Sequence, residues 1–526
     1  MVEKDNLAKT VSRNSLYTII YNVWYLGSRL ILTPLILAHV SIEEYGLWSY
    51  CFVVLSYLTL TAFGFNNTYI RYAADYRSRN ENDKLNELLS TGLITMICLS
   101  LVLFPLFWLL IPWLLDLLGI DPGLHETARG LLLGTAAIFV LNFSLAGYQS
   151  ILEGEQRIAM VRKIHLAASV VEIILIIIFF KAGLGVFSLL WAYVVRFSLV
   201  IVLNIFFAHR VFPFLQVGIG SYSKDALKKF VGFGNQMTLL GFLSLLINSM
   251  DRIFITRILH LEAVGLYEIG RKLPNIGMML PASIAGPMMP AASHLEGSSQ
   301  HDRLKRVYLV STRYLMIFSS MLYAFMIIFA PQIIEVWVGK GYPQSVMVMQ
   351  ILALGTFINL FTGIGTACVR GIGKPIYEIK YMVVSAVLIL TLAPLLIHYN
   401  GITGAAWAYC IGQSVGSIYF LWMANRLFEI PWSRFIEQVL PPAVLIFVMG
   451  LPSFALCNLL WSFGETSRWA GLGILAASGL FYLFAIMVAL NLFQKRMFSS
   501  DERQRISSLP LPTPFTGIWK RLWRPV

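Results

Sequence analysis

The sequence predicts an all-α polytopic membrane protein with about fourteen transmembrane helices. Hydrophobic residues make up 57% of the 526 positions and charged residues only 13%, about half the charged share of soluble domains. Apolar runs of about twenty residues, the length of one bilayer crossing, recur along the chain. Lys and Arg gather in alternate loops between these runs. These three observations exclude a soluble fold.

The order of the apolar runs predicts two pseudo-symmetric six-helix bundles followed by a C-terminal helix pair. We expect a cytoplasmic N-terminus (1–14), an N-lobe (15–208), a cytoplasmic linker (209–228), a C-lobe (229–424), a helix pair (437–491) and a basic cytoplasmic tail (492–526). The expected helices span residues 15–38, 45–70, 88–111, 130–151, 161–181, 186–208, 229–258, 265–291, 307–330, 346–369, 377–398, 403–424, 437–460 and 469–491.

The distribution of basic residues predicts the orientation of the chain. One set of alternate loops, together with the two termini, holds most of the Lys and Arg, so both termini are expected in the cytoplasm. The net charge of +13 is then explained by these loops, and we expect no nucleic-acid partner. The opposite loops hold Arg129, Lys181, Arg257, Lys340 and Arg468.

The motifs of several enzyme and metal-binding classes are missing from the sequence. The five cysteines lie in apolar segments without metal-ligand spacing, and the chain has no phosphate-binding G-x-x-x-x-G-K-[ST] loop. We therefore expect no catalytic residues, no metal site and no cofactor.

Two similar stretches predict a repeat. Ser41–Tyr50 and His260–Ile269 match at a shift of 219 residues, which superposes Gly46 on Gly265. Two further matches follow at nearly the same offset. Repeats with an even number of helices share one orientation in the membrane, and transporters of this kind bind substrate between their halves.

Charged residues inside the predicted spans are the candidate site residues. Charge is costly in hydrocarbon and normally faces a wet cavity or an opposite charge. A helical hairpin centred near Glu262 would bring Arg252 and Lys272 to one depth, since each lies ten residues from the turn. The substrate-binding candidates are Arg29, Arg252, Arg271 and Lys272, and the charge partners or coupling candidates are Asp251 and Glu268.

Two interpretations of these charges stay open. The acids and bases can neutralise one another inside the protein, or the basic excess can line a cavity that takes an anionic group such as phosphate. Arg196 fits a structural partner as well as it fits the cavity. Glu172 and His165 are either proton-coupling residues or packing residues.

Residues 15–65, 251–274 and 369–375 resemble the polysaccharide exporter (Wzx-type flippase) family, which belongs to the multidrug/oligosaccharidyl-lipid/polysaccharide exporter superfamily. The most specific element is the turn motif [LV]-x-x-E-x-x-G-L-[YW], present at 40–48 and 259–267. In related lipid II flippases, arginines on helices 1 and 8 line the central cavity. Arg29 and Arg271 match these arginines in helix and depth only.

The resemblance implies a two-lobed flippase in the bacterial inner membrane. Such a protein moves an undecaprenyl-pyrophosphate-linked oligosaccharide between leaflets by alternating access, coupled to an H⁺ or Na⁺ gradient. Its partners would be the lipid-linked glycan and the bilayer, with a polysaccharide polymerase and a chain-length regulator as further candidates. Two alternatives are a cation-coupled multidrug exporter of the same superfamily and a non-transporting membrane glycosyltransferase or polymerase. The second would need a long outer loop, and the longest expected here are residues 112–129 and 331–345.

Overall fold

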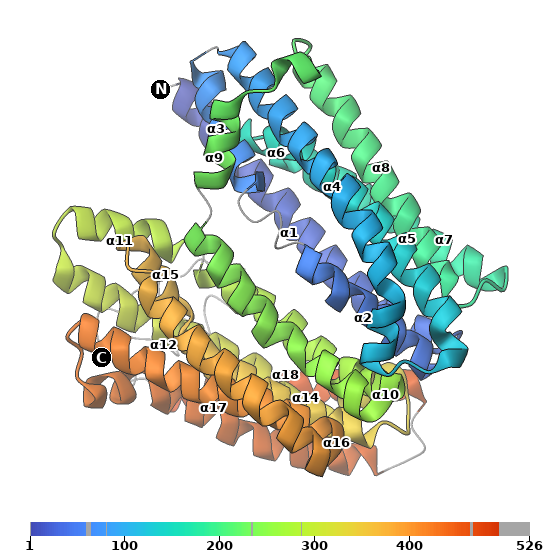
Figure 1. Ribbon diagram of the computed structural model, residues 1–526. Helices are drawn as coiled ribbons and strands as arrows, with labels where there is room; N and C mark the ends of the chain where they lie inside the picture. Colours follow the sequence, from blue (N-terminus) through green and yellow to red (C-terminus); the bar gives the residue numbers. More distant parts are fainter. Residues whose placement is uncertain are drawn as a thin grey trace. The chain divides into compact units, whose positions relative to one another are not determined.

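The described part of the chain consists of helices that fall into two compact units (Figure 1). The computed structural model describes residues 2–58, 65–79, 81–232, 235–285, 287–462 and 467–493. The units are Met1–Leu266 and Tyr267–Val526, and the long helix α10 contributes to both. The predicted basic tail lies outside the described residues, apart from its first two positions.

The described residues of the first unit form nine helices, two short 3-10 turns and the first part of α10. In chain order these are α1 (Val2–Leu37), α2 (Ile42–Leu58), α3 (Phe65–Ser78), α4 (Asn82–Leu118), η2 (Pro122–Leu124), α5 (His125–Ser144), α6 (Ala146–Gly154), α7 (Ile158–Lys181), α8 (Phe187–Val211), η3 (Ile219–Ser221), α9 (Lys224–Gly232) and α10 (Asn235–Ala285).

The second unit starts within α10 and ends with two long apolar helices. Its further elements are α11 (Met288–Gly297), α12 (His301–Ile328), α13 (Ala330–Val338), α14 (Pro343–Leu360), α15 (Gly363–Gly371), α16 (Ile376–Leu427), α17 (Trp432–Trp461) and α18 (Arg468–Leu492).

Eleven helical segments in the described residues are long and apolar enough to cross a membrane, which confirms the predicted class of multi-pass membrane protein. Two of them hold a residue with positive φ, namely His260 (φ 70°) in α10 and Gly401 (φ 58°) in α16. Each residue lies between two of the predicted spans, so α10 and α16 each cover two predicted helices. The total of fourteen stays a prediction, as does the pseudo-symmetry.

Several boundaries differ from those expected from hydropathy. The polar segment 1–14 is helical from Val2, because α1 continues past the apolar run. The expected outer loops are largely helical too: residues 112–118 belong to α4, residues 125–129 to α5 and residues 330–338 to α13. Hydropathy indicates which part of a helix lies in lipid. The helix itself can extend beyond that part, because its ends are set by backbone hydrogen bonding.

The two similar stretches pack against each other at their glycines. A Cβ on Gly46 would collide with the carbonyl oxygen of Leu261, and one on Gly265 would collide with that of Ile42. Leu261 lies four positions before Gly265, and Ile42 lies four positions before Gly46. Each glycine therefore contacts the backbone one helical turn before the other glycine, so the contact is reciprocal. Glycine is required at both positions because the two backbones touch.

The starts of these stretches differ, although their glycines match. Ser41 and Glu44 form a capping box at the start of α2: the Ser41 hydroxyl accepts from the Glu44 backbone N–H (3.1 Å), and the Glu44 carboxylate accepts from the Ser41 N–H (2.9 Å). The matching position in α10 is His260, where the helix breaks two residues before the expected turn centre at Glu262.

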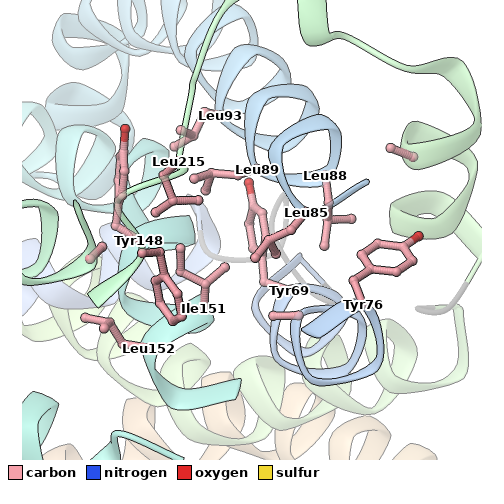
Figure 2. Packing of buried hydrophobic residues seen from close by; sticks show 14 of the residues in the cluster. Tyr69, Tyr76, Leu85, Leu88, Leu89, Leu93, Tyr148, Ile151, Leu152 and Leu215 are labelled. Atoms are coloured by element: carbon pink, nitrogen blue, oxygen red, sulfur yellow. The ribbon is translucent and has the colours of Figure 1, made fainter. Parts of the chain in front are cut away.

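One apolar core of the first unit gathers around Tyr69 of α3 (Figure 2). Leu85, Leu89 and Leu93 of α4 face it, and Ile151 of α6 closes another side. The leucines follow helical spacing, so one face of α4 is buried in this core. This packing fixes α3, α4 and α6 at the end of the unit where α7 begins.

Candidate functional site

A buried cluster of three charged side chains lies in the first unit. Glu172 of α7 accepts from Arg29 Nη2 of α1 at 2.9 Å and from Arg196 Nη1 of α8 at 3.0 Å. The exposed fractions of the side chains are 4% for Glu172, 6% for Arg196 and 24% for Arg29. One carboxylate thus neutralises one of two arginines, and the Glu172 cluster keeps a formal excess of one positive charge.

The packing of three helices brings this cluster together. α7 lies against both α1 and α8, and α7 and α8 form an antiparallel hairpin through residues 182–186. Glu172 and Arg196 each lie twelve residues from Leu184, so both stand about 18 Å from the hairpin turn at 1.5 Å per residue. The cluster therefore sits near the middle of both helices.

Aromatic rings surround the two arginines. The guanidinium carbon of Arg29 lies 5.0 Å from the ring centre of Tyr25, and that of Arg196 lies 5.8 Å from the same ring and 5.1 Å from Phe197. Such cation–π contacts stabilise a guanidinium away from water. The Nε–H groups of both arginines are buried and find no acceptor among the described residues, which leaves each arginine with an unused donor.

The hairpin charges are divided between the two units. In the first unit Asp251 is buried, and its carboxylate lies 3.7 Å from Nε of Arg252. Arg252 also donates through Nη2 to the Asn248 carbonyl at 2.6 Å. In the second unit Arg271 is buried, and Glu268 and Lys272 are half-buried. A shared cationic site of Arg252, Arg271 and Lys272 stays a prediction.

The sequence left the roles of Glu172 and Arg196 open, outside the substrate-binding candidates, and the structure pairs the two residues. Their equal distance from the α7–α8 turn predicts that both lie at one depth, by the same argument that linked Arg252 to Lys272.

His165, the other residue that the sequence left open, forms a hydrogen bond with Gln149 at 3.0 Å and packs on Tyr21, with ring centres 5.8 Å apart. Among the described residues, no group of three or more His, Cys, Asp or Glu is placed to hold a metal ion.

Solved structures with the same fold include a lipid flippase and a multidrug transporter. The chain aligns with the lipid II flippase MurJ in an inward closed conformation at a TM-score of 0.67 and 15% identity, over 92% of this chain and 99% of that one. An inward-facing multidrug MATE transporter of the MOP superfamily aligns at a TM-score of 0.66 and 18% identity, over 80% and 98%. At these identities the likeness shows the fold alone.

Comparison with a family model gives the family, and two sequence relatives agree with it. The putative O-antigen transporter of Shigella flexneri is 22% identical over 395 residues, which is 73% of this chain and 90% of that protein. The amylovoran biosynthesis protein AmsL of Erwinia amylovora is 21% identical over 333 residues, 62% and 83% of the two chains. The profile of the polysaccharide biosynthesis protein family matches residues 36–347. The chain therefore belongs to this family of polysaccharide exporters, as its resemblance implied.

Proposed function

We propose that this protein moves an undecaprenyl-pyrophosphate-linked oligosaccharide repeat unit across the bacterial inner membrane, for the synthesis of a surface polysaccharide. The family membership and the exporter fold support a transport function. The observation that carries the choice of substrate is the Glu172 cluster, in which two arginines share one carboxylate. Its residual positive charge, inside a membrane-spanning fold, suits a phosphate or pyrophosphate group.

The arginines have geometry suited to this task. A guanidinium offers donors in a planar fork that matches phosphate oxygens, and the buried Nε–H groups of Arg29 and Arg196 have no acceptor among the described residues. In the proposed mechanism Arg252, Arg271 and Lys272 supply further cationic contacts. The polyprenyl tail stays in lipid, and the transporter alternates between states that open to either side. This transport requires no covalent chemistry.

The remaining parts of the mechanism follow the family expectation. We propose both termini in the cytoplasm, an N-lobe and a C-lobe divided as the hydropathy suggests, and an H⁺ or Na⁺ gradient as the driving force. Asp251 and Glu268 are the proposed charge partners or coupling groups. A polysaccharide polymerase and a chain-length regulator are the proposed protein partners.

A cation-coupled multidrug exporter is the second candidate function, because the fold is shared with a MATE transporter. A cationic drug would need buried acids in excess of bases. The Glu172 cluster has the opposite balance, with one acid and two bases. The cluster therefore favours the anionic, lipid-linked substrate.

The test replaces two of the proposed substrate arginines and follows glycan export. In the encoding bacterium without its own copy of the gene, Arg252→Ala together with Arg271→Ala should abolish surface polysaccharide and leave lipid-linked repeat units in the inner leaflet. Surface glycan is measured by immunoblot, and the lipid-linked intermediate by extraction and mass spectrometry. The drug-exporter candidate is assayed in parallel by ethidium efflux.

Arg210→Gln is the matched control, because Arg210 is an exposed cation at the end of α8. This variant should export normally. Normal export by the double variant, with membrane insertion confirmed, would remove Arg252 and Arg271 from the proposed mechanism. Loss of ethidium efflux with intact glycan export would favour the drug exporter instead.

A further inference from the structure

A pocket opens where α1, α7 and α8 meet, beside Arg13 of α1 and the N-terminal end of α7. Its volume is about 270 Å³. Its lining combines three cations with four apolar side chains: Arg13, Arg157, Lys163, Ala159, Met160, Ile164 and Phe207. We call this site the mouth pocket. An apolar wall with a cationic rim fits an amphiphile that carries a phosphate, because basic pockets between membrane helices bind lipid head groups.

The cations of the mouth pocket are available for an anion. Among the described residues, Arg13, Arg157 and Lys163 form no ion pair, and all three are exposed. The nearest acid in sequence is Glu155, which pairs with Arg77 (Nε to Oε1, 3.4 Å). Burial raises the pKa of the Glu155 carboxyl, and the charges of Arg77 and Arg157 oppose that rise. The rim thus keeps an excess of positive charge.

The mouth pocket is held in shape by Asn14, which connects α1 to the start of α7. The Asn14 side chain accepts from the backbone N–H of Ala159 at 2.9 Å and donates to the carbonyl of Gln156 at 2.8 Å. Asn14 is itself buried. A side chain of α1 therefore caps the first turn of α7, so the pocket is a built feature of the fold.

A line of side chains on α1 connects the mouth pocket to the Glu172 cluster. Positions 13, 17, 21, 25 and 29 follow strict four-residue spacing and hold Arg, Tyr, Tyr, Tyr and Arg. Residues four apart are neighbours on a helix surface, and with 3.6 residues per turn the row winds around α1 by about 40° per step. Sixteen residues of helix cover about 24 Å, so the line runs from Arg13, where the apolar span of α1 begins, deep into that span. We call Tyr17, Tyr21 and Tyr25 the tyrosine stripe.

Each tyrosine of the stripe contacts a cation from another helix. Lys163 Nζ lies 4.5 Å from the ring centre of Tyr17, and the guanidinium carbon of Arg162 lies 5.8 Å from that of Tyr21. Arg196 of the Glu172 cluster reaches the Tyr25 ring. A cation therefore lies beside a ring face and a hydroxyl at each level between the pocket and the cluster. The cation at the Tyr21 level, Arg162, also lies 3.7 Å from the Glu153 carboxylate.

We infer that the mouth pocket is the first binding site for the phosphate of the lipid-linked substrate, and that the tyrosine stripe guides this phosphate to Arg29 and Arg196. The inference deepens the proposed function and rests on it. The rim cations bind the phosphate near the membrane surface, and the apolar wall contacts the first part of the lipid chain. Each step along the stripe exchanges one cationic contact for the next, so the anion is not left unpaired in the membrane.

The mouth pocket is tested by lipid binding to the full-length protein in nanodiscs, measured by native mass spectrometry. The probes are undecaprenyl pyrophosphate, phosphatidylglycerol and inorganic pyrophosphate. Arg157→Gln with Lys163→Gln should weaken binding of undecaprenyl pyrophosphate by about tenfold or more, since a charge-assisted hydrogen bond contributes roughly a factor of ten. Lys181→Gln with Arg129→Gln removes the same charge from two exposed positions in the opposite set of loops, and should leave binding unchanged.

The three probes distinguish the two sources of phosphate. Undecaprenyl pyrophosphate should bind at concentrations where phosphatidylglycerol does not compete. Equal competition by phosphatidylglycerol would overturn the substrate assignment and make the pocket a site for ordinary anionic lipid. Unchanged binding by the double variant would overturn the site itself.

The stripe is tested by flipping rates in proteoliposomes that carry the lipid-linked oligosaccharide. Tyr21→Leu should slow flipping by about tenfold, because the cation loses its ring face, while binding at the mouth pocket stays the same. Tyr21→Phe keeps the ring and should flip within about twofold of the unaltered protein. A wild-type rate for Tyr21→Leu would overturn the stripe. Failure of the unaltered protein to flip would instead overturn the proposed function, which separates the two failures.

Discussion

The Glu172 cluster and the mouth pocket are both basic and share α1, α7 and α8, yet they treat charge in opposite ways. In the cluster, Arg196 and Glu172 are more than nine-tenths buried and paired at 3.0 Å. In the mouth pocket the cations are exposed and, among the described residues, form no ion pair. Water solvates an exposed cation, whereas a buried one requires an internal counterion. Of these two sites, the one from which solvent is excluded therefore holds the counterion.

The largest expected effect comes from removing the counterion of the cluster. Glu172→Ala leaves the buried Arg196 without an acid, and breaking a buried pair in this way costs about 3–5 kcal/mol. Thermal unfolding in detergent, followed by tryptophan fluorescence, measures the loss. Glu153→Ala is the control: Glu153 lies 3.7 Å from Arg162 in a more exposed pair, so its removal should cost about 0–1 kcal/mol. Equal losses in the two variants would contradict the comparison.

An intermediate effect is expected at Asn14, which holds the mouth pocket together. Asn14→Ala removes the cap of α7 and the bond to the Gln156 carbonyl, and should destabilise the protein by about 1–2 kcal/mol. The same variant should bind undecaprenyl pyrophosphate less tightly, because the rim cations on α1 and α7 are no longer held together. Stability loss with unchanged lipid binding would show that the pocket forms without this cap.

The smallest effect on stability is expected from the rim cations themselves. Arg157→Gln with Lys163→Gln should change the free energy of unfolding by less than about 0.5 kcal/mol per residue, as is usual for exposed positions.

The two sites should also differ in their response to salt. Lipid binding by the unaltered protein should weaken as the salt concentration rises from 0.1 to 1 M, because the screening length falls from about 10 to about 3 Å. The penalty of Glu172→Ala should stay nearly constant over this range. A salt-independent mouth pocket would mean that its rim charges do not contribute.

The sequence was informative wherever one-dimensional patterns report on solvent. Long apolar runs predicted the class of fold, because a crossing helix must be apolar over about twenty residues. The matching turns also had a structural meaning, since Gly46 and Gly265 touch the partner backbones at Leu261 and Ile42. The helix boundaries were less accurate. α1 begins at Val2, well before its apolar run, because backbone hydrogen bonding does not depend on hydropathy.

The candidate site could be predicted only in part. Arg29 is identified by sequence because an arginine within an apolar run is costly. Its partner Glu172 lies 143 residues further along the chain, and no local pattern connects the two. Equal spacing from the α7–α8 turn relates Glu172 to Arg196, but does not show which faces of the two helices meet.

The sequence by itself determined that this chain is a helical membrane protein with basic residues inside its spans. Tertiary structure decided which of those residues have counterions and which are open to a ligand. The physical reason is that insertion into a membrane depends on the composition of each segment, whereas the pairing of Arg29 and Arg196 with Glu172 depends on distances of about 3 Å. Such distances arise only when α1, α7 and α8 pack with particular faces in contact.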